Sequence, residues 1–279
     1  MRKHIGSMAA VCLLSGGLGL TGSGVAVAQA GGTTPPPKVL VIQNEALKPG
    51  RGGSIHERTE GAFVRAFTAA KWPEHYLGMD SLSGKSRAVF LLRYDSLDAW
   101  QKDNDAVQKD PTLSAAFDGA AAADGEELES FEQSVFLYRE DMSLHAPVKI
   151  EDMRYMEVMI FEVKPGHRKD WDDLVKMYTT AYDKVPGAHW ATFEKLYGTQ
   201  SGSRFIAITP LKSLAEADQE LLNDKTVFSG MSPDQMKKLG ELSAAAIESS
   251  ETHLYAINPK LSYVPESWAT TNPAFWGQK

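Results

Sequence analysis

Residues 153–258 carry hydrophobic patterns typical of alternating strands and helices. Short apolar runs predict strands, and apolar positions that recur every three or four residues predict the buried face of a helix. In chain order, the segments are strand 156–163, helix 167–182, strands 189–198 and 204–208, helical regions from 213 and from 232, and strand 252–257. A glycine turn joins the two middle strands into a hairpin. The predicted order is β-α-β-β-α-β.

Residues 38–142 repeat the same order of elements. The corresponding segments are strand 39–42, helix 55–70, strands 75–82 and 87–94, a helical region from 96, and strand 135–138. The repeat is also visible in the residues themselves, because Leu47-Lys48-Pro49-Gly50 returns as Val163-Lys164-Pro165-Gly166, about 117 residues later. Such a long and constant spacing indicates that one folded unit was duplicated.

The order β-α-β-β-α-β is that of a ferredoxin-like unit, a four-stranded sheet with its helices on one face. The other face of such a sheet needs a cover, because it would otherwise expose a large apolar patch. In a duplicated chain the second sheet supplies that cover. We therefore expect an α+β fold in which two tandem ferredoxin-like βαββαβ units, 38–142 and 153–258, pack sheet to sheet and enclose a barrel.

The order of elements and the strand-Lys-Pro-Gly-helix opening of each unit resemble the dimeric α+β barrel superfamily over residues 38–258. This superfamily includes NIPSNAP-like proteins, stress-responsive barrel proteins and antibiotic-biosynthesis-type monooxygenases. The resemblance implies a tandem fusion of two barrel halves. It also implies a pocket such as the one in which oxygenases of the superfamily hold flat aromatic substrates. Because no catalytic motif accompanies the resemblance, any function drawn from it is analogy.

The N-terminal residues predict export. Arg2, Lys3 and His4 precede an apolar stretch, and Ala28-Gln29-Ala30 offers a cleavage site, so residues 1–30 are predicted to be a signal peptide. The mature protein is then periplasmic or secreted. Glycines interrupt the apolar stretch, and no integral membrane segment is expected in the mature chain. Residues 31–37, rich in Gly, Thr and Pro, predict an extended and mobile linker.

Composition excludes several classes of function. The single cysteine, Cys12, lies in the predicted signal peptide, so the mature chain has no thiol for a disulfide or a nucleophile. Loss of Arg2 and Lys3 leaves 27 basic against 36 acidic residues, a net charge of −9 without a basic cluster, and no nucleic acid partner is expected. The histidines form no H-E-x-x-H or similar pattern, so we predict neither a metal site nor another cofactor.

Two His/Trp pairs occupy equivalent places in the units, where the first helix leads into the second strand. They are His189 with Trp190, and Trp72 with His75. Such pairs can frame a pocket, with His189 as a proton-transfer group and the other three residues as ligand-binding groups. In the alternative interpretation, each histidine is a partly buried residue with a backbone partner.

Two carboxylates interrupt otherwise apolar strands. They are Glu157 and Glu194, and burial would raise the pKa of each into a range suited to proton transfer. If their strands are neighbours, the two can share a cavity with His189 or His253. In the alternative interpretation, both carboxylates lie on a solvated face of the sheet.

One arginine recurs in both units beside the predicted hairpin turn. Arg87 of the first unit corresponds to Arg204 of the second, and together they can bind an anionic group of a ligand. The alternative is that each arginine forms a charge pair at the end of its strand.

Residues 259–279 form a tail outside both units. The tail contains two tryptophans, Trp268 and Trp276, and is expected to wrap a surface without regular structure. Aromatic side chains of this size need a surface to pack on. The tail is therefore predicted either to seal an open end of the barrel or to contact a second molecule, which would make the protein a homo-oligomer.

Three functions are compatible with these features. The first is an exported small-ligand-binding or accessory protein that holds a small apolar or aromatic molecule in the barrel without a cofactor. The second is a cofactor-free monooxygenase-like or isomerase-like enzyme that uses His189 with Glu157 or Glu194. The third is a structural or assembly protein without a ligand. Acid and base groups around an enclosed cavity favour the enzyme, an apolar cavity favours binding, and a filled barrel favours the structural role.

Overall fold

The computed structural model describes residues 32–199 and 202–277, so the predicted signal peptide 1–30 lies outside the described residues. The first half contains strands β1 (Val39–Leu47), β2 (Tyr76–Ser81), β3 (Arg87–Tyr94) and β4 (Leu128–Tyr138), with helices α1 (Ser54–Ala70), α2 (Leu97–Lys109) and α3 (Pro111–Gly125). The second half contains strands β5 (Tyr155–Val163), β6 (Ala191–Tyr197), β7 (Ser203–Leu211) and β8 (Ile247–Ile257), with helices α4 (Arg168–Tyr182), α5 (Leu214–Gly230) and α6 (Pro233–Ala246).

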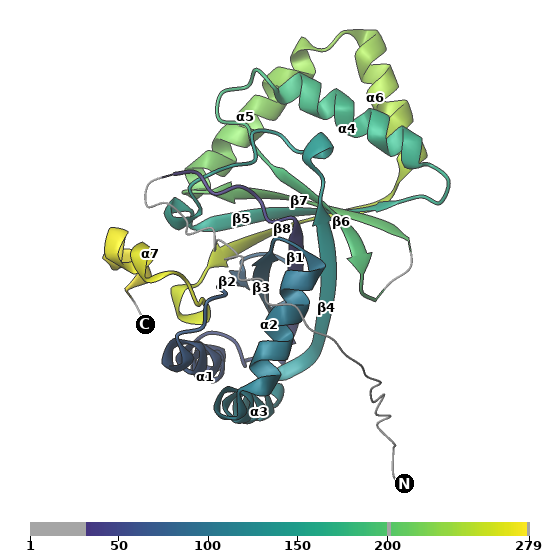
Figure 1. The fold of residues 1–279 in the computed structure, drawn as a ribbon. Coiled ribbons are helices and arrows are strands. Elements are labelled where there is room, and N and C mark those ends of the chain that lie inside the picture. Colours follow the sequence, from purple (N-terminus) through teal and green to yellow (C-terminus); the bar gives the residue numbers. More distant parts are fainter. Residues whose placement is uncertain (1–31, 200–201, 278–279) are drawn as a thin grey trace, which may run out of the picture.

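These strands join into one closed antiparallel barrel, in the order β1-β3-β2-β8-β5-β7-β6-β4 (Figure 1). Within each half the sheet has the ferredoxin-like order, and the pairs β2–β8 and β4–β6 connect the two sheets. Each edge strand therefore finds a partner in the other half, which removes the exposed edges of two separate sheets. The predicted fold class is confirmed, and the two sheets are joined along their edges as well as across the interior.

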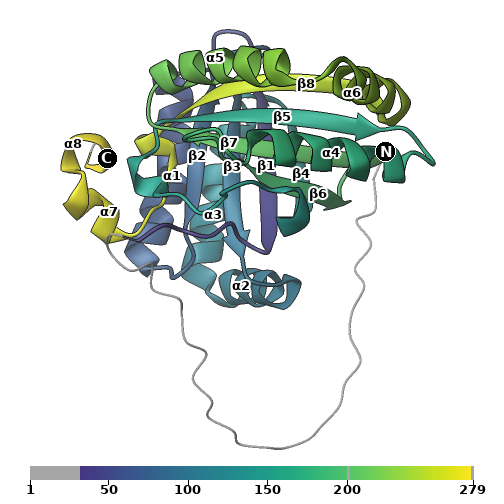
Figure 2. The same ribbon diagram turned by 90° about the horizontal axis from the view of Figure 1, so that it is seen from above.

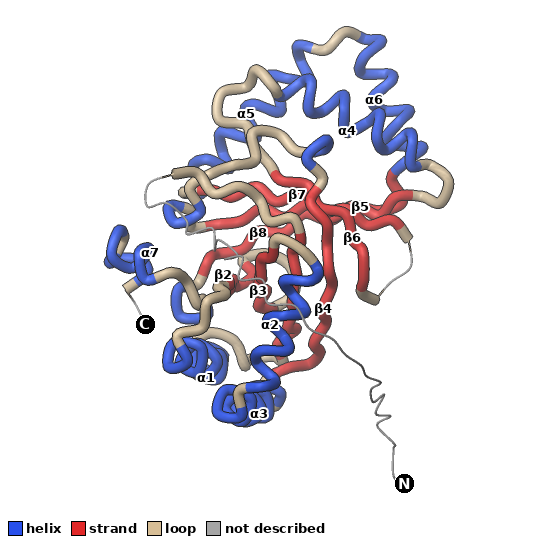
Figure 3. Tube along the Cα trace, viewed as in Figure 1, coloured by secondary structure: helices blue, strands red, loops and turns tan. Residues whose placement is uncertain are grey.

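Alternating side chains of each strand divide between the barrel interior and the helix layers. In β5, Met156 and Val158 belong to the interior cluster, whereas Phe161 and Val163 pack with residues of α4 and α6. Helices α4 to α6 cover the outside of the second half, and α1 to α3 cover the first (Figure 3). In the described ranges, none of these helices combines the length and the apolar character needed to cross a bilayer.

The segment predicted as a mobile linker is tied to the rest of the protein over its described part. Thr34 forms an antiparallel bridge with Val148, and its N–H donates to Val148 O at 2.7 Å. Arg93 Nη2 donates to Pro35 O at 3.2 Å. Prolines in the segment still offer carbonyl groups for such bonds, so a Pro-rich composition does not by itself prevent attachment.

The tail forms short helices, which corrects the expectation of irregular structure. A 3-10 turn (Pro259–Leu261), α7 (Glu266–Thr271) and α8 (Pro273–Trp276) follow β8. Trp276 is fully buried, and both Trp268 and Trp276 belong to the same hydrophobic cluster as the barrel interior. Trp276 Nε1 also donates to Glu151 O at 2.9 Å, in the segment between the halves. The tail therefore packs on its own barrel (Figure 2).

Candidate functional site

A small cavity lies inside the barrel, between the two halves, and its volume is about 80 Å³. Its apolar wall comes from both halves and includes Phe136 of β4, Val158 of β5 and Ile206 of β7. The rest of the wall is polar. The polar residues are Asn44, Arg87, Glu132, Ser134, Arg204 and Tyr255.

The charged residues of this wall and Asn44 gather at one end of the cavity. Asn44 lies late in β1, whereas Arg87, Glu132 and Arg204 lie early in β3, β4 and β7. Strands β3, β4 and β7 all run opposite to β1 around the barrel. Inward positions late in β1 and early in the other three strands therefore fall at the same end of the barrel.

Arg87 and Arg204 face this polar end from different halves. Arg204 Nε donates to Glu162 Oε1 of the neighbouring strand at 2.5 Å. Burial raises the pKa of Tyr255, and the guanidinium of Arg87, which hydrogen-bonds to Tyr255, offsets part of that rise. Glu132 Oε1 is buried and has no hydrogen-bond partner among the described residues. The polar end thus combines guanidinium donors with a phenol and an unsatisfied carboxyl oxygen.

The size of the cavity limits what it can hold. At about 80 Å³, the cavity is about half the size of a cavity of about 150 Å³ that binds benzene, so it suits a ligand of a few heavy atoms. Guanidinium groups bind carboxylates and similar planar anions through paired hydrogen bonds, and the apolar wall suits a short alkyl group. Chemically, the arrangement is suited to binding a small molecule that has one anionic end.

Solved structures contain barrels similar to this one. A protein from Fusobacterium nucleatum, described as a putative monooxygenase, matches with a TM-score of 0.51 at 10% sequence identity, over 78% of this chain and 91% of that chain. The chain has the dimeric α+β barrel fold. The resemblance drawn from its element order is thereby confirmed at the level of the fold.

Two further solved structures match with lower scores. A putative monooxygenase from Lactobacillus acidophilus has a TM-score of 0.49 at 11% identity, over 78% of this chain and 93% of that chain. A chlorite dismutase from Candidatus Nitrospira defluvii has a TM-score of 0.43 at 10% identity, over 84% and 95%. No protein-family model and no curated protein sequence matches the chain. Function must therefore be argued from the residues of the barrel themselves.

His189 and Trp190 lie just before β6 and do not line the cavity. His189 Nδ1 is 2.7 Å from Gly187 O, and its Nε2 is 2.8 Å from Pro210 O, so a backbone carbonyl oxygen lies within hydrogen-bond distance of each ring nitrogen. Trp190 Nε1 donates to Met142 O at 3.0 Å. These contacts agree with the alternative interpretation, in which the pair has backbone partners.

The expected rise in pKa is wrong for Glu194. Arg139 Nη1 donates to its carboxylate at 2.5 Å, and Arg168 Nη2 donates at 3.0 Å. Burial raises the pKa of Glu194, but the hydrogen bonds and charges of the two arginines outweigh burial and hold the pKa below its ordinary value. Strand β7 also separates the strands of Glu157 and Glu194, so the two carboxylates are not on neighbouring strands.

Glu157 lies on the helix side of β5, opposite in direction to its neighbours Met156 and Val158. Burial and the charge of Asp224 raise its pKa, which agrees with the expected direction. Burial together with Glu157 and Asp224 also raises the pKa of Glu220 to about 7. The carboxyl group of Glu157 therefore faces α5 rather than the barrel cavity. The structure does not bring Glu157, Glu194 and His189 together.

The other candidates from the sequence contact different parts of the protein. Trp72 Nε1 donates to Asp103 Oδ1 at 2.7 Å. The ring of His75 stacks on Tyr263 in the tail, with 4.8 Å between the ring centroids. His253 Nε2 lies 2.9 Å from Glu251 Oε2. Of the candidate residues that the sequence suggested, the cavity is lined by Arg87 and Arg204.

Four ionisable side chains that the sequence patterns did not single out meet beneath α1 and α3. They are Glu45 from β1, His56 and Glu60 from α1, and Asp124 from α3. All four are buried, and one ligand atom of each lies within 4.8 Å of those of the others. His56 and Glu60 are four residues apart on one helix, and this spacing is the signal in the sequence that could have revealed the cluster.

Burial perturbs the protonation of this cluster. Burial, reinforced by the charges of Glu45 and Asp124, raises the pKa of Glu60 to about 10. Burial lowers the pKa of His56, but the hydrogen bond with Glu45 and the charge of Asp124 outweigh it, so the pKa of His56 is raised overall. At neutral pH, the cluster on its own therefore holds a proton on Glu60.

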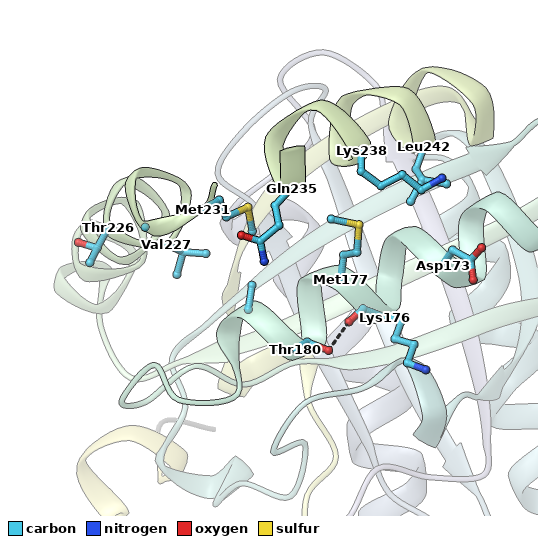
Figure 4. Close-up of a pocket in the computed structure, with 12 residues that line it drawn as sticks. Asp173, Lys176, Met177, Thr180, Thr226, Val227, Met231, Gln235, Lys238 and Leu242 are labelled. Carbon is cyan, nitrogen blue, oxygen red and sulfur yellow. Dashed lines mark hydrogen bonds between the residues drawn. The ribbon is translucent and has the colours of Figure 1, made fainter. Parts of the chain in front are cut away.

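A wider groove of about 610 Å³ runs between α4, α5 and α6 on the outside of the second half (Figure 4). Met177 and Met231 form part of its apolar floor, and Lys176 and Lys238 lie along it. The described residues of its lining include no buried polar side chain that would orient a ligand. The groove therefore offers less chemistry than the barrel cavity.

Proposed function

We propose that the protein is an exported binding protein for a small molecule that combines an anionic group with a short apolar part, held in the barrel cavity. The observation that carries this proposal is the meeting of Arg87 and Arg204 at one cavity. These arginines occupy matching places in the two units, and each reaches the cavity from its own half. Duplication and barrel closure thus bring two arginine side chains beside one apolar wall, which supports a role in binding an anion.

The contacts of the two arginines leave donors for a ligand. A guanidinium carries five N–H groups. Arg204 uses its Nε on Glu162, so its terminal nitrogens can bind a carboxylate while the pair with Glu162 is kept. Arg87, Tyr255 and Glu132 complete the polar end, and the apolar part of the ligand contacts Val158 and Ile206. The small volume favours acids of a few heavy atoms.

Export is part of the proposal and rests on the N-terminal residues alone. Arg2 and Lys3, the apolar stretch that follows and the Ala28-Gln29-Ala30 site together support cleavage, with a mature chain that starts near Gly31. Mass spectrometry of the protein recovered from the cell envelope of its own host measures the mature N-terminus. A protein that keeps residues 1–30 in that fraction contradicts cleavage.

Native mass spectrometry of the protein purified from its own host shows whether a small acid is retained. Titration with acetate, propionate and isobutyrate, followed by NMR shifts of the cavity methyl groups, then measures affinity. Replacing Arg204→Gln should weaken binding about 10-fold to 100-fold, since a hydrogen bond to a charged group contributes about 1.5–3 kcal/mol. The same loss is expected for Arg87→Gln.

Two control variants separate binding from general charge effects. Arg58→Gln removes an exposed arginine of α1 and should leave affinity unchanged. Glu162→Gln keeps Arg204 but removes its acidic partner, so anion affinity should stay the same or increase. If no acid of this size binds, or if both cavity arginine variants bind as well as the natural protein, the proposed function is wrong.

A further inference from the structure

We propose that Glu45, His56, Glu60 and Asp124 form a binding site for one divalent first-row transition-metal ion, in the helix layer of the first half and separate from the barrel cavity. The donor set is one imidazole nitrogen and up to three carboxylate oxygens. Imidazole with carboxylates suits Mn²⁺, Fe²⁺, Co²⁺ and Zn²⁺. The residues come from three elements, β1, α1 and α3, so an ion would join them.

The spacing of the donor atoms fits one ion. Bonds of about 2.1 Å place two ligand atoms of the same ion about 3.0–3.4 Å apart. His56 Nε2 lies 3.1 Å from Glu45 Oε2 and 3.4 Å from Asp124 Oδ1. A carboxyl oxygen of Glu60 lies within 4.8 Å of these atoms, which small side-chain rotations can shorten. Thr59 Oγ1 donates to Asp124 Oδ1 at 2.6 Å and supports that carboxylate from outside the cluster, as residues around metal ligands do.

An unsatisfied oxygen independently points to a missing ligand. Glu60 is only 4% exposed, and its Oε1 has no hydrogen-bond partner among the described residues. A buried polar atom without a partner is destabilising, and most such atoms in proteins are paired or bind an ion or a water. A cation among these residues would bind this oxygen and balance the carboxylates that surround it.

The second half of the protein shows that the fold does not require charge at this place. Lys48 Nζ donates to Glu126 O in the first half and Lys164 Nζ donates to Ala244 O in the second, so the ends of α3 and α6 occupy matching places in the two halves. The corresponding layer of the second half, between β5, α4 and α6, is apolar. Phe161 of β5 matches Glu45 in the repeat, and the buried residues of this layer include Trp171, Leu174 and Val175 of α4 and Leu242 of α6.

Without a ligand, the four buried ionisable groups stabilise the first half less than the apolar residues of the second half stabilise theirs. Apolar side chains of similar volume stabilise such a site at least as well as buried charges do. The second half uses them, whereas the first half holds four ionisable groups in the same layer. A metal ion would convert this unfavourable layer into a cross-link between β1, α1 and α3, and its binding energy would add to the stability of the fold.

Metal content and thermal stability test the site. Protein produced without a histidine tag and purified without chelator is assayed by elemental mass spectrometry, and about one ion per chain is expected. Protein stripped by chelator is refolded with Mn²⁺, Co²⁺ or Zn²⁺, because metal ions would reach the buried cluster only slowly in the folded protein. At about 100 times its dissociation constant, a bound ion should raise the melting temperature by about 5–10 °C. Co²⁺ should also give visible absorption bands.

Conservative variants assign the ion to this cluster. Glu60→Gln and Asp124→Asn keep the side-chain shapes, so the metal-free variants should melt at or above the melting temperature of the metal-free natural protein. Both should lose most of the metal-induced increase. The control Glu251→Gln changes the exposed partner of His253, outside the cluster, and should keep the increase. The proposal is overturned if none of the three ions binds stoichiometrically to the stripped protein, or if the increase persists in both cluster variants.

Discussion

Gly78 of β2 lies directly against Leu261, the residue that ends the 3-10 turn of the tail. A Cβ atom at position 78 would be 2.6 Å from Leu261 Cβ, closer than real side chains come. The same contact is held by hydrogen bonds, since Gly78 N donates to Ser262 Oγ at 2.9 Å and Asn258 N donates to Gly78 O at 2.9 Å. Only a residue without a side chain lets the tail approach the barrel this closely.

Substitution of this glycine should therefore loosen the attachment of the tail. Gly78→Ala is expected to lower the free energy of unfolding by about 1–3 kcal/mol, because the added methyl group overlaps the backbone of the tail. Gly119→Ala is the matched control, since a Cβ there meets nothing within 4 Å on the exposed face of α3. The control should stabilise the protein by up to about 1 kcal/mol. Urea unfolding measures both, and equal stability of the two variants contradicts the close approach.

Removal of the buried tryptophan of the tail should cost much more than removal of an exposed apolar residue. Trp276→Ala empties a fully buried position and leaves Glu151 O without its donor, so a loss of about 3–5 kcal/mol is expected. Leu221→Ala, at a position 69% exposed, should change stability by less than about 0.5 kcal/mol.

Because Trp268 and Trp276 pack on their own chain, deletion of residues 266–279 should destabilise the protein without changing its oligomeric state, which light scattering checks.

Glu194 should make the protein sensitive to acid. Burial raises its pKa, but Arg168 and Arg139 lower the pKa by more than burial raises it. The pKa in the folded protein is therefore below the ordinary value of 4.5. The resulting stabilisation is present above about pH 4.5 and is lost as the pH falls through the lower, folded value. Glu194→Gln should cost about 1 kcal/mol at pH 7, a modest figure because solvent screens the partly exposed pair. If the variant and the natural protein differ as much at pH 3 as at pH 7, the assignment is wrong.

The barrel could be predicted from the sequence because the evidence for it is repeated. Each element of one half has a counterpart in the other, so an ambiguous segment in one unit can be checked against its copy. The pairing of β2 with β8 and of β4 with β6 could not be predicted, because local hydrophobic patterns set which face of a strand is buried and do not set which edge it joins. The tail was recognised as needing a surface, but its short helices depend on contacts with the barrel.

Candidate site residues were harder to predict because their roles depend on distant partners. The local sequence of Glu194 does not show that its carboxylate pairs with Arg139 and Arg168, which are distant in the sequence. Arg87 and Arg204 were found because duplication marks both. The cluster of Glu45, His56, Glu60 and Asp124 has no copy in the second half, so comparison of the two units concealed it.

Glu220 should make stability decrease as the pH rises. Burial, followed by the charges of Glu157 and Asp224, raises the pKa of Glu220 to about 7 in the folded protein, whereas the unfolded chain releases this proton near the ordinary value of 4.5. Between these values the folded state holds a proton that the unfolded state has lost, so its stabilisation is full below about pH 4.5 and is lost as the pH passes 7.

The difference between Glu220→Gln and the natural protein isolates this effect from other titrating groups, Glu60 among them. Glu220→Gln should gain stability relative to the natural protein from pH 5 to pH 8, by about 1 kcal/mol after allowance for solvent screening, and the gain should level off above pH 8. Glu248→Gln, an exposed change on β8, should show no such trend. Urea unfolding at each pH gives the differences. A constant difference across this range for Glu220→Gln would mean that Glu220 titrates as an ordinary surface carboxylate.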